Sequence, residues 1–194
     1  MAVRAGEKRK SSVEKKLFTV EEYHRMVETG VLDEGSKVEL IEGEIYPMAA
    51  MGSRHAACID RLNKLLSARA GDTAIVRVQC PIELHDTSEP EPDVSLLKFR
   101  EDFYADAHPK PEDTLLAVEV SDTTLAHDTS VKLPAYARAG IPEVWIVDPN
   151  SNSIQIHSNP QTGEYRNTTR IRRGDTFESK ALSGAEIAAS DILG

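Results

Sequence analysis

The fold is decided by the stretch Leu115-Leu-Ala-Val-Glu119-Val-Ser121, an almost wholly apolar run with one carboxylate near its end. Such a run is typical of a central β-strand that is buried on both faces. Upstream, Glu89-Pro-Glu-Pro-Asp93-Val-Ser-Leu-Leu97 places a second carboxylate at the start of another strand. The separation of the two acids predicts antiparallel neighbours with Asp93 opposite Glu119. Because acids held that close repel each other unless a cation lies between them, the pair predicts a divalent metal site.

The composition fits one α/β or α+β domain. The chain has 194 residues and 40% hydrophobic content, enough to bury a core without disulfide or metal staples. A net charge of −9 argues against broad attraction to a polyanion, so any phosphate-binding surface must be local. No apolar run has the length of a membrane span or a secretory signal, and we expect no membrane partner. Cys58 and Cys80 match no metal spacing, which indicates reduced thiols in the cytoplasm.

The chain divides into a basic N-terminal arm over residues 1–16 and a single domain over residues 17–194. We expect the arm to be disordered, either as a solvated tail or as a segment that touches nucleic acid. In the domain, the sequence predicts helices over 19–28, 53–71 and 131–139. The predicted strands are 38–41, 44–46, 74–80, 93–97, 115–120, 143–148, 153–158 and 164–170, the last two forming a hairpin. The tail from Phe177 onward carries no clear pattern.

The strand ending at Val120, the helix beginning near Val131 and the strand at Val144 form a β-loop-α-β unit with a right-handed crossover. Its helix starts at the carboxyl end of the preceding strand, so Lys132 projects toward the edge that carries Glu119 and Ser121. Ligands of open α/β sheets favour that edge. We therefore expect Asp93, Glu119 and Lys132 to converge, with the Val120 carbonyl as a further oxygen ligand.

This set of groups suits phosphodiester hydrolysis. Oxygen ligands without a histidine or cysteine partner favour Mg²⁺, with Mn²⁺ as a substitute, over Zn²⁺. The reaction needs an activated water, neutralised charge in the transition state and a stabilised leaving oxygen. A metal held by carboxylates and a lysine can supply all three.

Three segments carry a family resemblance: Pro92-Asp93, Glu119-Val-Ser121 and Lys132-Leu-Pro-Ala-Tyr136-Ala-Arg-Ala-Gly140-Ile-Pro-Glu-Val-Trp-Ile-Val-Asp148. They resemble the Uma-two family of restriction endonucleases, within the PD-(D/E)XK nuclease superfamily, over roughly residues 17–180. The resemblance implies a restriction-endonuclease-like fold, a central mixed β-sheet flanked by helices, with Asp93 and Glu119 as metal ligands. It departs from the superfamily pattern at Ser121, where a lysine is expected, and it indicates that Lys132 has taken over that role.

The leading hypothesis is a Mg²⁺-dependent endonuclease that hydrolyses DNA. Lys132 would position the attacking water or stabilise the phosphate, and Ser121 would line the pocket. The resemblance adds Glu39, which would complete the metal site or hold a metal-bound water. It also adds His55, which would meet a phosphate or orient a carboxylate. A homodimer is suggested only by analogy with fold relatives, because cutting both strands needs two sites.

Structural alternatives exist for four of the candidate residues, but burial of an unpaired carboxylate would be costly for Glu119. Asp93 could solubilise an acidic loop, and Lys132 could form a surface pair with Asp128. Glu39 could be an exposed strand residue, and His55 could be bonded to the backbone at a helix start. Tyr136 and Trp145 are most simply packing residues, and His127 receives no role.

The alternative functions use the same fold. A catalytically silent member would bind nucleic acid or protein, which the net charge and Ser121 favour. Hydrolysis of RNA or of another phosphoester would use the same residues.

Overall fold

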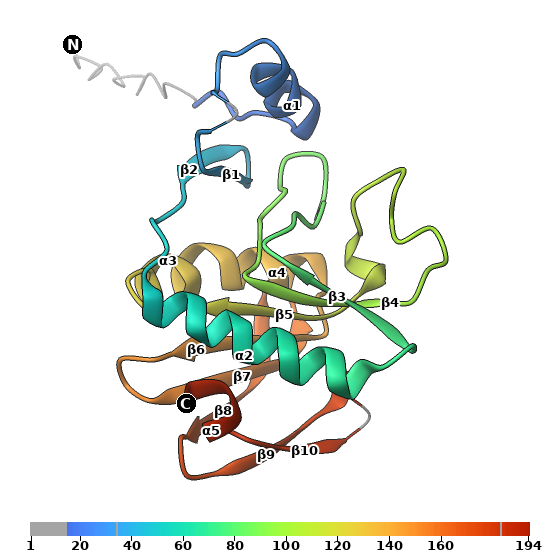
Figure 1. Ribbon diagram of the computed structural model, residues 1–194. Helices are drawn as coiled ribbons and strands as arrows, with labels where there is room; N and C mark the ends of the chain where they lie inside the picture. Colours follow the sequence, from blue (N-terminus) through green and yellow to red (C-terminus); the bar gives the residue numbers. More distant parts are fainter. Residues whose placement is uncertain (1–14, 34, 183) are drawn as a thin grey trace, which may run out of the picture.

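A mixed six-stranded β-sheet forms the centre of the protein in the computed structural model, which describes residues 15–33, 35–182 and 184–194 (Figure 1). The strand order is β3-β4-β5-β6-β7-β8, and only β5 and β6 are parallel. The strands are β3 (Ala74–Val78), β4 (Val94–Lys98), β5 (Thr114–Val120), β6 (Glu143–Asp148), β7 (Ser153–Gln161) and β8 (Glu164–Arg172). The predicted mixed sheet flanked by helices is confirmed.

The register of β4 and β5 brings the two acids together. Val94 pairs with Val118 in antiparallel register, so the same register continued by one residue sets Asp93 opposite Glu119. β5 is buried along nearly its whole length, as its apolar sequence predicts. The predicted crossover is also present, because β5 and β6 are parallel with Val120 beside Val147.

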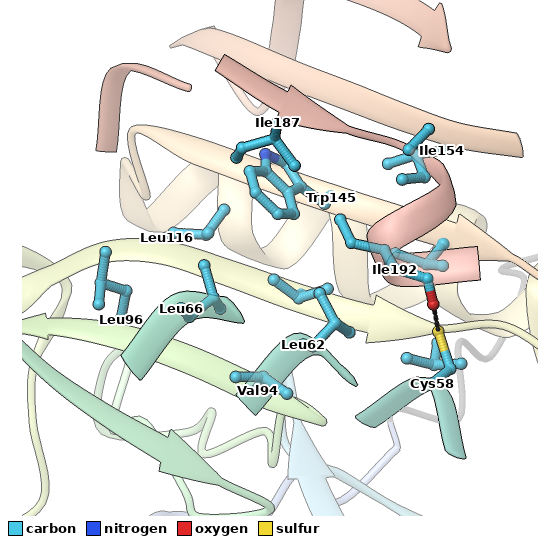
Figure 2. Close-up of a cluster of buried hydrophobic side chains, with 14 of the residues drawn as sticks. Cys58, Leu62, Leu66, Val94, Leu96, Leu116, Trp145, Ile154, Ile187 and Ile192 are labelled. Atoms are coloured by element: carbon cyan, nitrogen blue, oxygen red, sulfur yellow. Dashed lines mark hydrogen bonds between the residues drawn. The ribbon is translucent and has the colours of Figure 1, made fainter. Parts of the chain in front are cut away.

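One face of the sheet is covered by α2 (Ser53–Ala70) and by α5 (Ser190–Leu193) (Figures 1 and 2). Cys58 lies in the core between them, and its thiol donates to the Ile192 carbonyl at 3.4 Å (Figure 2). The side chains that fill this layer are apolar and come from both helices, from the sheet and from residues 185–188, among them Leu62, Leu66, Val94, Leu96, Leu116, Trp145, Ile154, Ile187 and Ile192.

The opposite face is covered by a helical segment in three parts: α3 (Leu125–His127), a π-helical turn η2 (Asp128–Lys132) and α4 (Leu133–Ala139). The sequence predicted a helix only from residue 131, so its start was placed six residues too late. Pro134 stands where the π turn passes into α4. Proline lacks a backbone N–H and its ring clashes with the preceding turn of a regular α-helix. Here the preceding turn is the wider π turn, which can accommodate the proline.

Two small hairpins flank the sheet. The first, β1 (Val38–Ile41) with β2 (Glu44–Pro47), lies beside α1 (Val20–Glu28), whose start is stabilised by a capping box between Thr19 and Glu22. The second, β9 (Thr176–Ser179) with β10 (Ala185–Ala188), belongs to the tail for which no structure was predicted. Short 3₁₀ turns occupy η1 (Pro111–Asp113) and η3 (Lys180–Leu182). The predicted basic arm falls almost entirely on residues 1–14, which lie outside the described residues.

The β7–β8 hairpin is longer than predicted. The strands continue to Gln161 and resume at Glu164, which leaves a two-residue turn at Thr162-Gly163, both with positive φ. A turn with positive φ at both positions matches the twist of the flanking strands, so pairing extends past Pro160. Among the described residues, none forms a helix both long and apolar enough to cross a membrane.

Candidate active site

A cleft of about 420 Å³ opens at the edge of the sheet where β4 begins and β5 ends. The hairpin β1–β2, α1 and the first turn of α2 supply one side of it, and the segment from α3 to η2 supplies the other. Its ionisable lining includes Glu39, His55, Asp93, Glu119, His127 and Lys132. The three predicted residues Asp93, Glu119 and Lys132, and both additional residues, Glu39 and His55, therefore line one cleft.

Asp93 is held by two elements. Its Oδ2 accepts from the Val120 amide at 2.8 Å, and its Oδ1 lies 2.9 Å from Nε2 of His55 in α2. The side-chain hydrogen bond to Asp93 raises the pKa of His55 above its ordinary value, against the opposing effect of burial. Asp93 is only 9% exposed, so it is not a solubilising loop residue, and His55 contacts a carboxylate rather than the backbone.

Glu119 is the most deeply buried acid of the cleft. It is 3% exposed, and its Oε1 accepts from Lys132 Nζ at 2.8 Å and from the Tyr136 hydroxyl at 2.6 Å. Burial raises the pKa of Glu119 well above its ordinary value, and of the neighbouring charges only Lys132 opposes that effect. A carboxylate in this position needs positive charge close to it.

Lys132 is enclosed by oxygen atoms. Besides Glu119, its Nζ donates to Glu39 Oε2 at 3.0 Å and to the Glu91 carbonyl at 3.1 Å. Burial alone would lower the pKa of Lys132, but Glu119 and Glu39 raise it above its ordinary value. An ammonium has three N–H donors, and these three acceptors match them. Lys132 can therefore bind a substrate phosphate only by exchanging one of these contacts.

The surface pair of Lys132 with Asp128 does not form. Asp128 is itself buried, and its Oδ2 accepts from the Ser121 hydroxyl at 2.7 Å and from the Thr124 hydroxyl at 2.5 Å. Ser121 is fully buried, so in place of the expected lysine this position anchors the start of the helical segment rather than facing the cleft. The Val120 carbonyl accepts from the Asp122 amide at 3.1 Å.

The π turn brings the side chains of Lys132 and His127 to the same carboxylate, that of Glu39. Lys132 Nζ lies 3.0 Å from Glu39 Oε2, and His127 Nε2 lies 3.6 Å from Glu39 Oε1. In a regular α-helix, residues five apart point about 140° away from each other. Here the Leu133 amide donates to the Asp128 carbonyl, the five-residue spacing of a π-helix, so His127 and Lys132 share a face. Glu39 is 4% exposed, and its reading as an exposed strand residue is wrong.

The sequence pattern did not predict three of the residues that contribute to the site. Tyr136 was assigned to packing, and it is fully buried, but its hydroxyl also binds Glu119. Its position four residues after Lys132, one turn along the same helix face, was the signal available for it. His127 and Asp128 had no such signal, because their placement depends on the π turn.

The donor set fits a hard divalent cation held with few protein ligands. Asp93, Glu119 and the Val120 carbonyl supply only oxygen, and the carboxylates Glu39, Asp93 and Glu119 outnumber the ammonium of Lys132. Within the described ranges, no three His, Cys, Asp or Glu side chains converge closely enough to hold an ion by themselves. Mg²⁺ commonly binds one or two carboxylates and completes its shell with water and substrate phosphate, which matches this arrangement.

Tyr136→Phe is expected to lower the free energy of unfolding by about 1.5–3 kcal/mol, the contribution typical of a hydrogen bond to a charged group. The substitution removes only the hydroxyl that donates to Glu119, so the loss reports that single contact. Urea unfolding followed by circular dichroism measures it. Tyr104→Phe is the matched control, because its hydroxyl donates to the neutral Lys98 carbonyl away from the cleft. An equal loss in both variants would show that the Glu119 contact has no special weight.

Comparisons with a family model and with solved structures both match proteins described as nucleases. The model of the Uma2 family, described as "Putative restriction endonuclease", matches residues 20–190. Among solved structures, a protein of Anabaena variabilis ATCC 29413, described as "a putative nuclease belonging to DUF820", aligns with a TM-score of 0.67. The two sequences are 15% identical, and the alignment covers 91% of this chain and 97% of that chain, so the likeness is one of fold. No curated protein matches the sequence.

Proposed function

The chain belongs to the Uma2 family, and on that premise we propose that it is a Mg²⁺-dependent endonuclease that hydrolyses phosphodiester bonds in DNA. The family and the nuclease fold support a nuclease acting on nucleic acid. The dependence on Mg²⁺ and the choice of DNA as the substrate are the more specific parts of the proposal.

One observation carries the proposal: Glu119, which is only 3% exposed, lies across the strand register from Asp93 in the lining of a cleft. Burying a carboxylate costs several kcal/mol unless a cation compensates it. The ammonium of Lys132 is shared with Glu39, so it compensates only part of the charge. A purely structural role would be filled at lower cost by an apolar residue at this position of a central strand.

The residues have distinct tasks in the proposed reaction. Asp93 and Glu119 would hold the cation, which supplies Lewis-acid polarisation of the phosphate and lowers the pKa of a water. His55 fixes the orientation of Asp93, and Tyr136 fixes that of Glu119. Lys132 places a positive charge beside Glu119, and it would stabilise the phosphate by exchanging its contact with the Glu91 carbonyl, the one acceptor without a charge.

The direct test uses purified protein with supercoiled and linear DNA in Mg²⁺, in Mn²⁺ and in EDTA. We expect nicking of supercoiled DNA with either metal and none in EDTA. Failure to cut any DNA form with either metal, by protein whose circular dichroism shows it folded, would refute the proposal.

His55→Gln is expected to weaken Mn²⁺ binding by about 10–100-fold, the usual cost of losing a residue that orients a ligand. Glutamine removes the imidazole that bonds Asp93 Oδ1, but leaves Asp93 bonded to the Val120 amide. Isothermal calorimetry with Mn²⁺ measures the effect without any substrate. His85→Gln, an exposed site outside the cleft lining, is the matched control. Unchanged Mn²⁺ affinity in His55→Gln would remove His55 from the site.

A binding protein without catalysis is the second candidate. The specific observation in its favour is that protein acceptors match all three donors of Lys132. Calorimetry distinguishes the nuclease from the binding protein. If no Mn²⁺ binds at millimolar concentration, the metal-dependent nuclease is excluded and the binding function is the better account.

A further inference from the structure

Arginines gather in a second pocket, of about 370 Å³, that the proposed reaction does not use. Its charged lining is Arg170, Arg172 and Arg173, and Ser151 and Ser153 contribute hydroxyls. The protein as a whole carries a net charge of −9, so a local gathering of three arginines stands out against its surroundings. Such a pocket has the chemistry of a site for anionic groups.

One of the three arginines, Arg170, is positioned by neutral partners. Arg170 Nε donates to Ser153 Oγ, and its Nη2 donates to Ser151 Oγ, both at 3.1 Å. Within the described part of the chain, none of the three arginines forms an ion pair. A guanidinium has five N–H donors, so Arg170 keeps most of them for a ligand.

Two nearby carboxylates, those of Asp148 and Asp175, bond to groups other than the guanidinium groups. Asp148 accepts from the Ser151 hydroxyl and from the amides of Asn150 and Ser151, so its charge is taken up by its own turn. Asp175 Oδ2 accepts from the backbone amide of Arg172 at 2.9 Å. The positive charge of the pocket is thus left without a bonded counter-ion.

The sheet places this pocket on the same edge as the candidate active site. Val120 at the end of β5 lies beside Val147, and Asp148 pairs with Ser153, which in turn pairs with Arg172 at the end of β8 (Figure 1). Three strand spacings separate β5 from β8, about 14 Å. That separation corresponds to about four base-pair steps along a duplex.

From this alignment we propose that the arginine pocket binds the sugar–phosphate backbone of the substrate, a few nucleotides from the phosphate that is cut. The inference rests on the proposed function, because DNA that enters the cleft would pass along this sheet edge. Contacts of this kind position a substrate without reading its sequence. They also explain how a protein with a net negative charge can hold a polyanion at all.

The test measures DNA binding in EDTA, where no cleavage occurs. Fluorescence anisotropy of a labelled duplex is recorded over a range of salt concentrations for wild type and for Arg172→Gln/Arg173→Gln. We expect the variant to bind more weakly, with the slope of log affinity against log salt reduced by about 2, one for each lost phosphate contact. The matched control is Arg69→Gln/Arg166→Gln, which removes two exposed arginines from the far end of α2 and the start of β8. The control should keep the wild-type slope.

The outcomes separate the two proposals. If the wild type cuts DNA with Mg²⁺ but Arg172→Gln/Arg173→Gln keeps the wild-type slope, this inference is overturned and the proposed endonuclease activity is not. The pocket would then be a candidate site for an acidic protein partner. If the wild type does not bind DNA in EDTA, the inference is equally overturned. If the slope falls in Arg172→Gln/Arg173→Gln alone, the inference is supported, even for a protein that fails to cut.

Discussion

Glu119→Gln is expected to lower Mg²⁺-dependent cleavage by about a thousandfold or more and to leave the fold intact. Glutamine keeps the shape of the side chain but removes one of the two carboxylates available to the cation. Charge stabilisation by a bound metal amounts to several kcal/mol in the transition state, and about 4 kcal/mol corresponds to a thousandfold in rate. The fold should tolerate the change, because the glutamine amide oxygen can still accept from Lys132 and from the Tyr136 hydroxyl, and Lys132 keeps its ion pair with Glu39.

Two measurements on the same preparation check this prediction. Nicking of supercoiled DNA gives the rate, and calorimetry with Mn²⁺ gives the metal affinity, which should fall with it. Glu112→Gln makes the same chemical change at an exposed position in η1 and should retain both properties. A Glu119→Gln protein that binds Mn²⁺ and cuts DNA like the wild type would remove Glu119 from the metal site.

Lys132→Met is expected to destabilise the fold by about 3–5 kcal/mol, the usual result of deleting one partner from a buried ion pair. The ammonium is the charge that Glu39 and Glu119 share, at 3.0 and 2.8 Å. Methionine keeps much of the volume of the side chain, so the loss reflects two uncompensated carboxylates rather than a cavity. Urea unfolding measures it, with Lys64→Met on the exposed side of α2 as the matched control.

A double variant separates the structural role of Lys132 from its role in the reaction. Lys132→Met/Glu39→Gln removes one of the two stranded carboxylates, so stability should recover in part. Cleavage should be lost in both the single and the double variant, because the positive charge beside Glu119 is missing in each. If the double variant recovers both stability and cleavage, Lys132 only neutralises Glu39. If Lys132→Met lowers the free energy of unfolding by less than about 1 kcal/mol, the contacts of Lys132 are worth no more than a surface ion pair, which would contradict a buried pair.

The juxtaposition of Asp93 and Glu119 could be predicted from sequence because it depends on strands. Nearly continuous apolar runs define two neighbouring buried strands, and antiparallel pairing then sets which residues face each other. Lys132 followed from the direction of a crossover, because a helix that returns antiparallel to the preceding strand starts at the carboxyl end of that strand. Both arguments use regularities of backbone geometry and need no detail of side-chain packing.

The contacts of His127 and the ordered tail lay beyond such rules. His127 reaches Glu39 only because the helical segment contains a π turn, and nothing in local propensity distinguishes that turn from an α-helix. In the tail, Phe177 packs edge-on against Trp145 with ring centroids 5.1 Å apart, and Ile187 is fully buried beside them. Those strands are short, and long-range packing rather than their own pattern determines them.

The π turn also makes the site sensitive to chain length. A turn with five-residue spacing holds one residue more than an α-helical turn, so it can be lost through the deletion of a single residue. Ala135 and Tyr136 would keep α4 in place, because both are fully buried against the sheet. The residues before the turn would instead rotate by about 100°, and His127 would leave Glu39. A shortened sequence could thus preserve the whole core and still lose one side of the cleft.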